Sequence, residues 1–184
     1  MVIIKPGRNP RLFCCTNLPT LLTKGFIVCR VEKEKAVKKK FSEYDASEAV
    51  EIVRAFEGER LKAYQCSAGV WTIGVGHTKG VKEGDRITLE QSDELLKSDL
   101  EGFKKEMIPL VDVEVTRGQF VALLSFVFNL GTKAFMTSTL RKKLNKGDFE
   151  GASFEFLKWK FVNGEEVRGL LNRRKAEREL FNYE

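Results

Sequence analysis

Apolar positions first follow a helical period along the chain and then alternate as they do in strands. Asp45 or Ser47 can cap a helix that Gly58 ends. Its apolar residues fall on one face: Ala49, Val50, Val53 and Phe56. Residues 60–80 are rich in glycine and alternate in polarity, which predicts small antiparallel hairpins. One helix followed by a small sheet is therefore expected over this stretch.

Two capping boxes predict the next two helices. Thr88, with Gln91 three residues later, opens one helix, and Pro109 stops it. Thr116 and Gln119 repeat the device before a helix that is apolar on most sides. Such a helix is expected to lie at the centre of the core.

Shorter helices complete the chain. They are expected near 138–145, 148–160 and 169–183. Gly147 and the Asn163-Gly164 pair separate them. The order of one helix, a small antiparallel sheet and a helical lobe indicates an α+β fold that is mostly helical.

Residues 1–45 read differently from the remaining body, 46–184. Short strand-like runs at 2–4 and 26–31 are separated by proline and glycine. The first 40 residues hold 10 Lys and Arg against 2 Glu, a balance of +8, whereas the rest hold 22 Lys and Arg against 24 Asp and Glu, a balance of −2. We interpret this segment as an irregular basic arm, either simply solvated or docked on an acidic partner surface or anionic wall polymer.

Composition narrows the class of protein. The longest mostly apolar stretch, 17–29, contains proline, lysine and glycine and falls below the roughly 20 residues that span a bilayer, so no transmembrane segment is expected. The cysteines are Cys14, Cys15, Cys29 and Cys66; they lack metal-ligand spacing, and His77 is the only histidine. Neither a metal, another cofactor nor a nucleic-acid partner is expected.

One run, 56–77, carries the candidate chemistry: FEGERLKAYQCSAGVWTIGVGH. Eight residues separate Glu57 from Cys66, and five separate Cys66 from Thr72. The run resembles the active-site signature of phage-type lysozymes, the endolysins that cut bacterial peptidoglycan. That signature is a Glu at a helix end, an Asp or occasionally a Cys, a Thr, and a closing TIGxGH. Cys66 occupies the position where most members carry Asp.

The resemblance covers about residues 46–184 and leaves out 1–45. The runs FNLG at 128–131, STL at 138–140 and GLLNRR at 169–174 also look like this family's later helices. The resemblance implies a two-lobed lysozyme-like architecture for the body. A domain starting at Ala46 is then expected to fold and to cleave without the arm.

The resemblance assigns roles to three residues. Glycoside hydrolysis generally needs a protonated acid on the leaving oxygen and a second group that handles water or the sugar cation. Glu57 is the candidate acid, and Thr72 would orient a water beside Cys66 in an inverting cleavage. A thiol with a pKa of about 8.5 is mostly neutral at pH 7, so Cys66 does not replace an Asp unless its surroundings favour thiolate. Cys66 could instead be a packed apolar side chain.

Supporting residues follow from the same resemblance. His77 is expected to pair with Asp99 on the next helix, a structural contact. Arg173 aligns with a family position near the catalytic Glu, where a cation would hold the carboxylate; a solvated arginine is the alternative. Glu59 is interpreted as structural.

Two functions remain open at this point. The first is a phage muramidase that cleaves the β-1,4 bond between N-acetylmuramic acid and N-acetylglucosamine. It would act as a free endolysin, released from the host cytoplasm to the periplasm with a holin, or as a virion- or tail-associated lysozyme. The second is a lysozyme-like structural module, catalytically impaired at Cys66, that attaches to other virion or baseplate proteins through residues 1–45.

Overall fold

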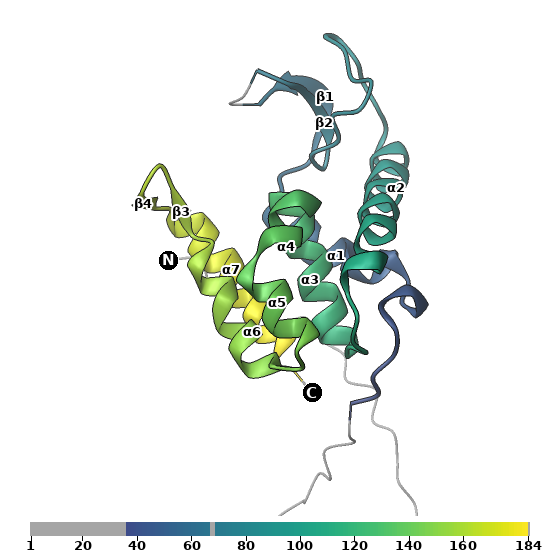
Figure 1. Ribbon diagram of the computed structural model, residues 1–184. Helices are drawn as coiled ribbons and strands as arrows, with labels where there is room; N and C mark the ends of the chain where they lie inside the picture. Colours follow the sequence, from purple (N-terminus) through teal and green to yellow (C-terminus); the bar gives the residue numbers. More distant parts are fainter. Residues whose placement is uncertain (1–35, 67–68, 184) are drawn as a thin grey trace, which may run out of the picture. The chain divides into compact units, whose positions relative to one another are not determined.

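The computed structural model describes residues 36–66 and 69–183 (Figure 1). The described residues all belong to one compact unit. The strand-like runs predicted at 2–4 and 26–31 lie outside the described residues.

The first predicted helix and sheet are present. A 3-10 turn, Ala46–Ala49, runs directly into α1, Val50–Phe56, and the Asp45 carboxylate caps the turn by accepting from the Ser47 backbone N–H at 2.8 Å. Strands β1, Arg60–Gln65, and β2, Trp71–Gly74, form an antiparallel two-stranded sheet.

Both capping boxes open long helices. α2 spans Leu89–Met107 and α3 spans Arg117–Leu130. The Thr88 and Thr116 hydroxyls each accept from the backbone N–H three residues on at 3.2 Å. A 3-10 turn, Ile108–Leu110, carries the proline that stops α2.

The last part of the chain is helical with one small hairpin. Its elements are α4, Thr132–Thr137; α5, Thr139–Asn145; α6, Phe149–Glu155, with a 3-10 turn at Phe156–Lys158; β3, Phe161–Val162; β4, Glu165–Glu166; and α7, Arg168–Phe181. The sequence pattern did not predict α4. The break at Asn163 and Gly164 is a tight hairpin turn in which both residues have positive φ, 52° and 86°.

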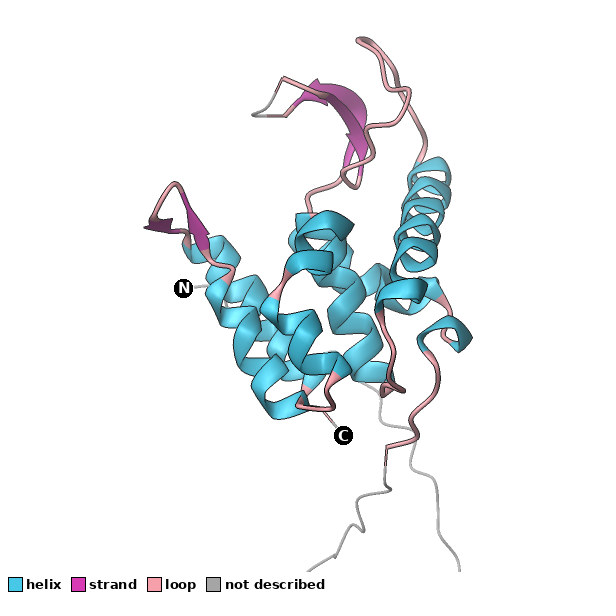
Figure 2. Cartoon of the chain, in the orientation of Figure 1, coloured by secondary structure: helices cyan, strands magenta, loops and turns pink. Residues whose placement is uncertain are grey.

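Helices pack around α3, and the described part of the chain is mostly helical with two small sheets (Figure 2). Nine consecutive residues of α3, 119–127, are buried, as the apolar pattern predicts for a central helix. Phe126 of α3 meets Phe156 edge to face at 5.4 Å between ring centroids. The α+β prediction is confirmed. No described helix is long and apolar enough to cross a bilayer.

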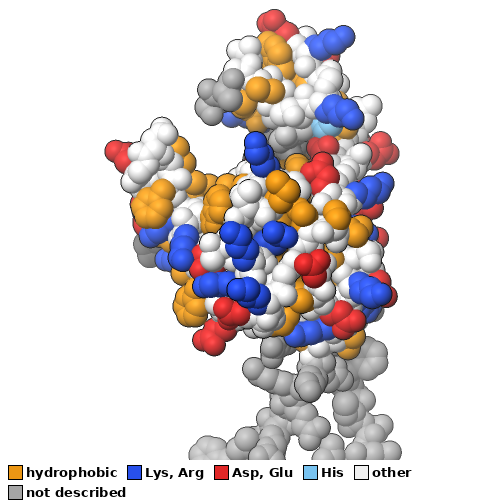
Figure 3. All heavy atoms as spheres, viewed as in Figure 1, with side chains coloured by type: hydrophobic (Ala, Val, Ile, Leu, Met, Phe, Trp, Pro, Cys, Tyr) orange, Lys and Arg blue, Asp and Glu red, His pale blue; other side chains and the backbone are white. Residues whose placement is uncertain are grey.

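Charge on the folded body is mixed. On the face in view, Lys and Arg side chains are interspersed with Asp and Glu (Figure 3). This distribution agrees with the near-neutral balance of the chain after residue 40.

The compact unit begins earlier than the sequence pattern placed it. Lys39 and Val115 exchange two backbone hydrogen bonds of 3.0 and 2.9 Å. Phe41, in the 3-10 turn Phe41–Glu43, and Tyr44 are 2% and 6% exposed, and both rings contact Phe120 of α3. The division at residue 45 therefore cuts through the core, and residues 36–45 belong with the body.

Removing residues 1–45 is expected to destabilise the protein, in contrast to the expectation from sequence. The truncation deletes two buried aromatic side chains, each of which contributes on the order of 3–5 kcal/mol in comparable substitutions, against a total stability of about 5–15 kcal/mol. A truncation that starts at Lys33 keeps both rings. Thermal unfolding followed by circular dichroism should show a much lower Tm for the Ala46 start than for the Lys33 start. Equal Tm values would contradict this account of the core.

Candidate active site

Glu57 sits where α1 ends. Its backbone N–H still donates to the Val53 carbonyl at 2.9 Å, but its own φ and ψ of −93° and 130° turn the chain out of the helix. Its side chain is 27% exposed and forms an ion pair with Arg173 Nη1. A carboxyl group held from one side and open on another can contact both the protein and a bound ligand.

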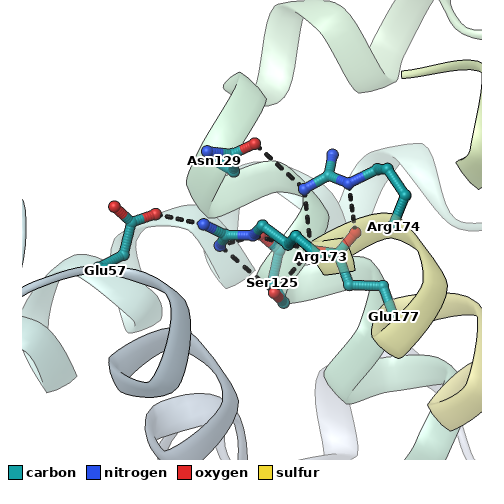
Figure 4. A network of polar contacts seen from close by, with 6 residues as sticks. All are labelled: Glu57, Ser125, Asn129, Arg173, Arg174 and Glu177. Carbon is teal, nitrogen blue, oxygen red and sulfur yellow. Dashed lines mark hydrogen bonds and ion pairs between the residues drawn. The ribbon is translucent and has the colours of Figure 1, made fainter. Parts of the chain in front are cut away.

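Arg173 is fixed by three separate acceptors (Figure 4). It lies on α7, and its side chain is almost fully buried. Nη1 contacts Glu57, Nε donates to Glu177 Oε1 at 3.1 Å, and Nη2 donates to the Ser125 carbonyl at 3.1 Å. Because each nitrogen has a different partner, the guanidinium has one orientation in which all are satisfied.

Behind Arg173 lies a second, fully buried ion pair. Arg174 Nη2 donates to Glu177 Oε1 at 3.0 Å and to Asn129 Oδ1 at 3.1 Å. Arg174 Nε lies 2.9 Å from Glu177 Oε2 but is not aligned as a hydrogen bond. The Ser125 hydroxyl donates to Glu177 Oε1 at 2.8 Å. Two guanidinium groups and one hydroxyl thus point at a single carboxylate.

Burial and charge oppose each other in this pair. Burial raises the pKa of Glu177, and the arginines and the Ser125 hydroxyl act in the opposite direction. Burial also lowers the pKa of Arg174 to about 10, and the nearby Glu177 charge opposes that change. Because Glu177 accepts from the Ser125 hydroxyl and from both guanidinium groups, we treat it as a carboxylate and both arginines as cations.

One carbonyl connects Cys66 with Thr72. The Val70 carbonyl accepts from the Cys66 backbone N–H and from the Thr72 hydroxyl, each at 3.0 Å. Cys66 follows the last residue of β1, and Thr72 lies in β2 opposite Tyr64. Thr72 is buried, and its hydroxyl already donates its proton to the Val70 carbonyl. Toward any further partner the Thr72 oxygen can therefore act only as an acceptor.

His77 and Asp99 make the contact that the sequence predicted. His77 Nδ1 lies 2.8 Å from Asp99 Oδ2, and Nε2 lies 3.0 Å from the Lys79 carbonyl. Ile73 and His77 exchange two backbone hydrogen bonds around a turn that contains Gly74. His77 therefore ties the turn after β2 to α2.

Two further contacts hold the sheet to α2. Gly74 has a φ of +62°, and a Cβ there would lie 2.9 Å from the Ser92 hydroxyl oxygen. That hydroxyl donates to Glu59 Oε1 at 2.7 Å. This bond joins Glu59, which directly precedes β1, to α2.

The sequence matches the family Phage lysozyme over residues 54–177, more than half of the chain. This chain belongs to the phage lysozyme family. It is 48% identical over 134 residues to an endolysin of Acyrthosiphon pisum secondary endosymbiont phage 1, covering 71% of this chain and 92% of that protein. It is 43% identical over 141 residues to the endolysin of Salmonella phage P22, covering 74% and 96%.

A solved structure shows the same fold. The muramidase domain of SpmX from Asticaccaulis excentricus superposes with a TM-score of 0.70 at 37% identity, covering 74% of this chain and 95% of that domain. The lysozyme-like architecture expected from the sequence is therefore confirmed for this member of the phage lysozyme family.

Sequence reasoning found part of this phage lysozyme site and missed the rest. The resemblance implied Arg173 beside Glu57, with a solvated arginine as the alternative, and His77 beside Asp99. Both contacts are present. Sequence reasoning did not single out Glu177. The available signal was spacing, because residues three and four positions apart lie on one helix face, and Glu177 follows the two arginines at those intervals. Across the described residues, no three His, Cys, Asp or Glu side chains are grouped as metal ligands.

Proposed function

We propose that this protein is a muramidase that cleaves the β-1,4 bond between N-acetylmuramic acid and N-acetylglucosamine in peptidoglycan. The observation that carries the proposal is Glu57, fixed at the end of α1 by Arg173 and still partly exposed. The family membership and the two endolysin relatives support the same class of substrate.

Glu57 acts as the proton donor in this proposal. Arg173 contacts Oε1 of Glu57, which leaves Oε2 as the oxygen that carries the proton to the leaving glycosidic oxygen. Because Arg173 holds the carboxyl group in one orientation, little conformational entropy is lost when Glu57 aligns with the leaving oxygen.

Cys66 and Thr72 form the water side of the proposed site. The Val70 carbonyl holds both, so their relative position is fixed by the backbone. A water that donates to the Thr72 hydroxyl oxygen can be activated by Cys66 in its thiolate form. The thiolate takes the water's proton and becomes a thiol as the water oxygen attacks the anomeric carbon. His77 and Asp99 support this part of the chain and take no part in proton transfer.

The competing function is a lysozyme-like module without catalysis. The feature behind it is Cys66, a thiol at the position where the family signature usually has Asp. Gram-negative cells with a permeabilised outer membrane separate the two. The proposed enzyme should reduce their turbidity at catalytic protein concentrations. A protein that binds these cells without clearing them would be the structural module.

Two placements in the phage remain within the proposal. The enzyme is either a free endolysin released to the periplasm or a virion-associated lysozyme docked through the arm. Mass spectrometry of purified virions distinguishes them, because only a docked enzyme is present in stoichiometric amount.

A further inference from the structure

Glu177 is a fully buried carboxylate that the proposed reaction does not use directly. It lies on α7, one turn after Arg173, and its Oε1 accepts from Arg173, Arg174 and Ser125 at 3.1, 3.0 and 2.8 Å. Burying a charge is costly unless it is paired and hydrogen-bonded, so three donors on one oxygen mark a built arrangement. The network leads outward through Arg173 to Glu57 (Figure 4).

The charges behind Glu57 can be counted. In this network α7 contributes Arg173, Arg174 and Glu177, and α3 contributes only the uncharged Ser125 and Asn129. Two cations and one anion leave a net charge of +1 facing Glu57. Each additional positive charge favours the ionised form of a nearby carboxyl group. A proton donor must keep its proton until the bond breaks, so an excess of positive charge at this place would work against it.

We propose that Glu177 is a positioning residue that sets the pH range in which Glu57 donates its proton. It does so in two ways: it orients Arg173 toward Glu57, and it cancels one of the two positive charges behind it. The inference rests on the proposed function, in which Glu57 is the proton donor.

Two single variants change the charge behind Glu57 in opposite directions, and the double variant leaves it unchanged. Glu177→Gln raises it from +1 to +2, Arg174→Met lowers it to 0, and the double variant restores +1. Methionine is flexible and apolar and fills the space of the arginine stem. Exchanging a buried ion pair for uncharged groups is often tolerated, so the double variant should fold even if Glu177→Gln alone does not.

The readout is the initial rate of cleavage of purified peptidoglycan as a function of pH. The alkaline limb of that profile reports loss of the donor's proton. We expect it to move to lower pH by on the order of one unit in Glu177→Gln and to higher pH in Arg174→Met. In the double variant it should return to the wild-type position.

Glu155 supplies a matched control. It is a buried carboxylate on α6, held by Lys143 Nζ at 2.7 Å and Lys158 Nζ at 2.9 Å. Glu155→Gln makes the same chemical change away from the Glu57 network. It should lower Tm and leave the alkaline limb where it is.

Limbs that stay in place in both single variants, or that move in the same direction, would overturn the inference while leaving the muramidase proposal intact. If Glu177→Gln does not fold, the other two variants decide. The alkaline limb should still move to higher pH in Arg174→Met and return to the wild-type position in the double variant, and a limb that does not move in Arg174→Met would overturn the inference. A wild-type protein without activity at any pH would instead contradict the proposed function itself.

Discussion

Replacing Glu57 with glutamine is expected to lower the rate of peptidoglycan cleavage by about 10²–10⁴-fold, the usual contribution of a positioned proton donor. Glutamine has the size of glutamate and can accept from Arg173 through its amide oxygen, so the Arg173 network and the fold should persist. It has no acidic proton to give to the leaving oxygen. The rate is measured as turbidity loss of purified peptidoglycan, with circular dichroism confirming the fold.

Glu59→Gln is the matched control for this change. Glu59 lies two residues away and accepts from Ser92, a contact that an amide oxygen can replace. We expect near-wild-type rates for Glu59→Gln, with at most a small loss of stability. Wild-type rates in Glu57→Gln would show that Glu57 is not the proton donor.

The second large effect is expected at Cys66. Cys66→Ala should lower the rate by about 10²-fold or more, because no side chain remains to take a proton from the attacking water. Cys66→Asp should keep or raise activity, since an ionised carboxylate is available at neutral pH. The backbone contact of Cys66 with Val70 is independent of the side chain, so neither change removes the bond that places this residue.

Redox treatment tests the same residue without mutation. Oxidation of a thiol to sulfenic acid is reversible by reductant, so mild oxidant should inhibit the wild type and reductant should restore it. Cys66→Asp should be insensitive to the same treatment. If Cys66→Ala cleaves as fast as wild type, the thiol only fills space and the water-activating role is wrong.

Local sequence signals predicted most of the fold. Thr88 and Thr116 identified the two long helices because a capping box is a local device whose partners lie three residues apart. Asn163 and Gly164 were read only as a break, although both adopt positive φ and form the turn of a hairpin. The hairpin strands are two residues each, too short to show alternation.

The start of the body was misplaced because its contacts are far apart in sequence. Phe41 and Tyr44 stand in a polar, lysine-rich stretch without a helical or strand-like period. Their partner is Phe120, more than seventy residues away, which no local pattern reveals. The resemblance to phage lysozymes also stopped near residue 46, because the motifs that carry it all lie after that residue.

The candidate site divides in the same way. Glu57, Cys66 and Thr72 were found as a spaced motif, and their catalytic roles stay predictions. Glu177 was missed because α7 is polar on average. In the sequence of such a helix, a buried carboxylate cannot be told from an exposed one. Only packing of α7 against α3, which brings Ser125 beside Glu177, distinguishes it.

The identity of the sugar at each newly formed glycan end tests the central claim most directly. Purified peptidoglycan is digested with the wild-type protein, the products are reduced with borohydride, and the reduced sugar is identified by mass spectrometry. A muramidase leaves N-acetylmuramic acid at each new reducing end, so N-acetylmuramitol should accumulate with wild type and be nearly absent with Glu57→Gln. New ends that are reduced N-acetylglucosamine, or free amino groups released from the peptide stems, would contradict the proposed reaction.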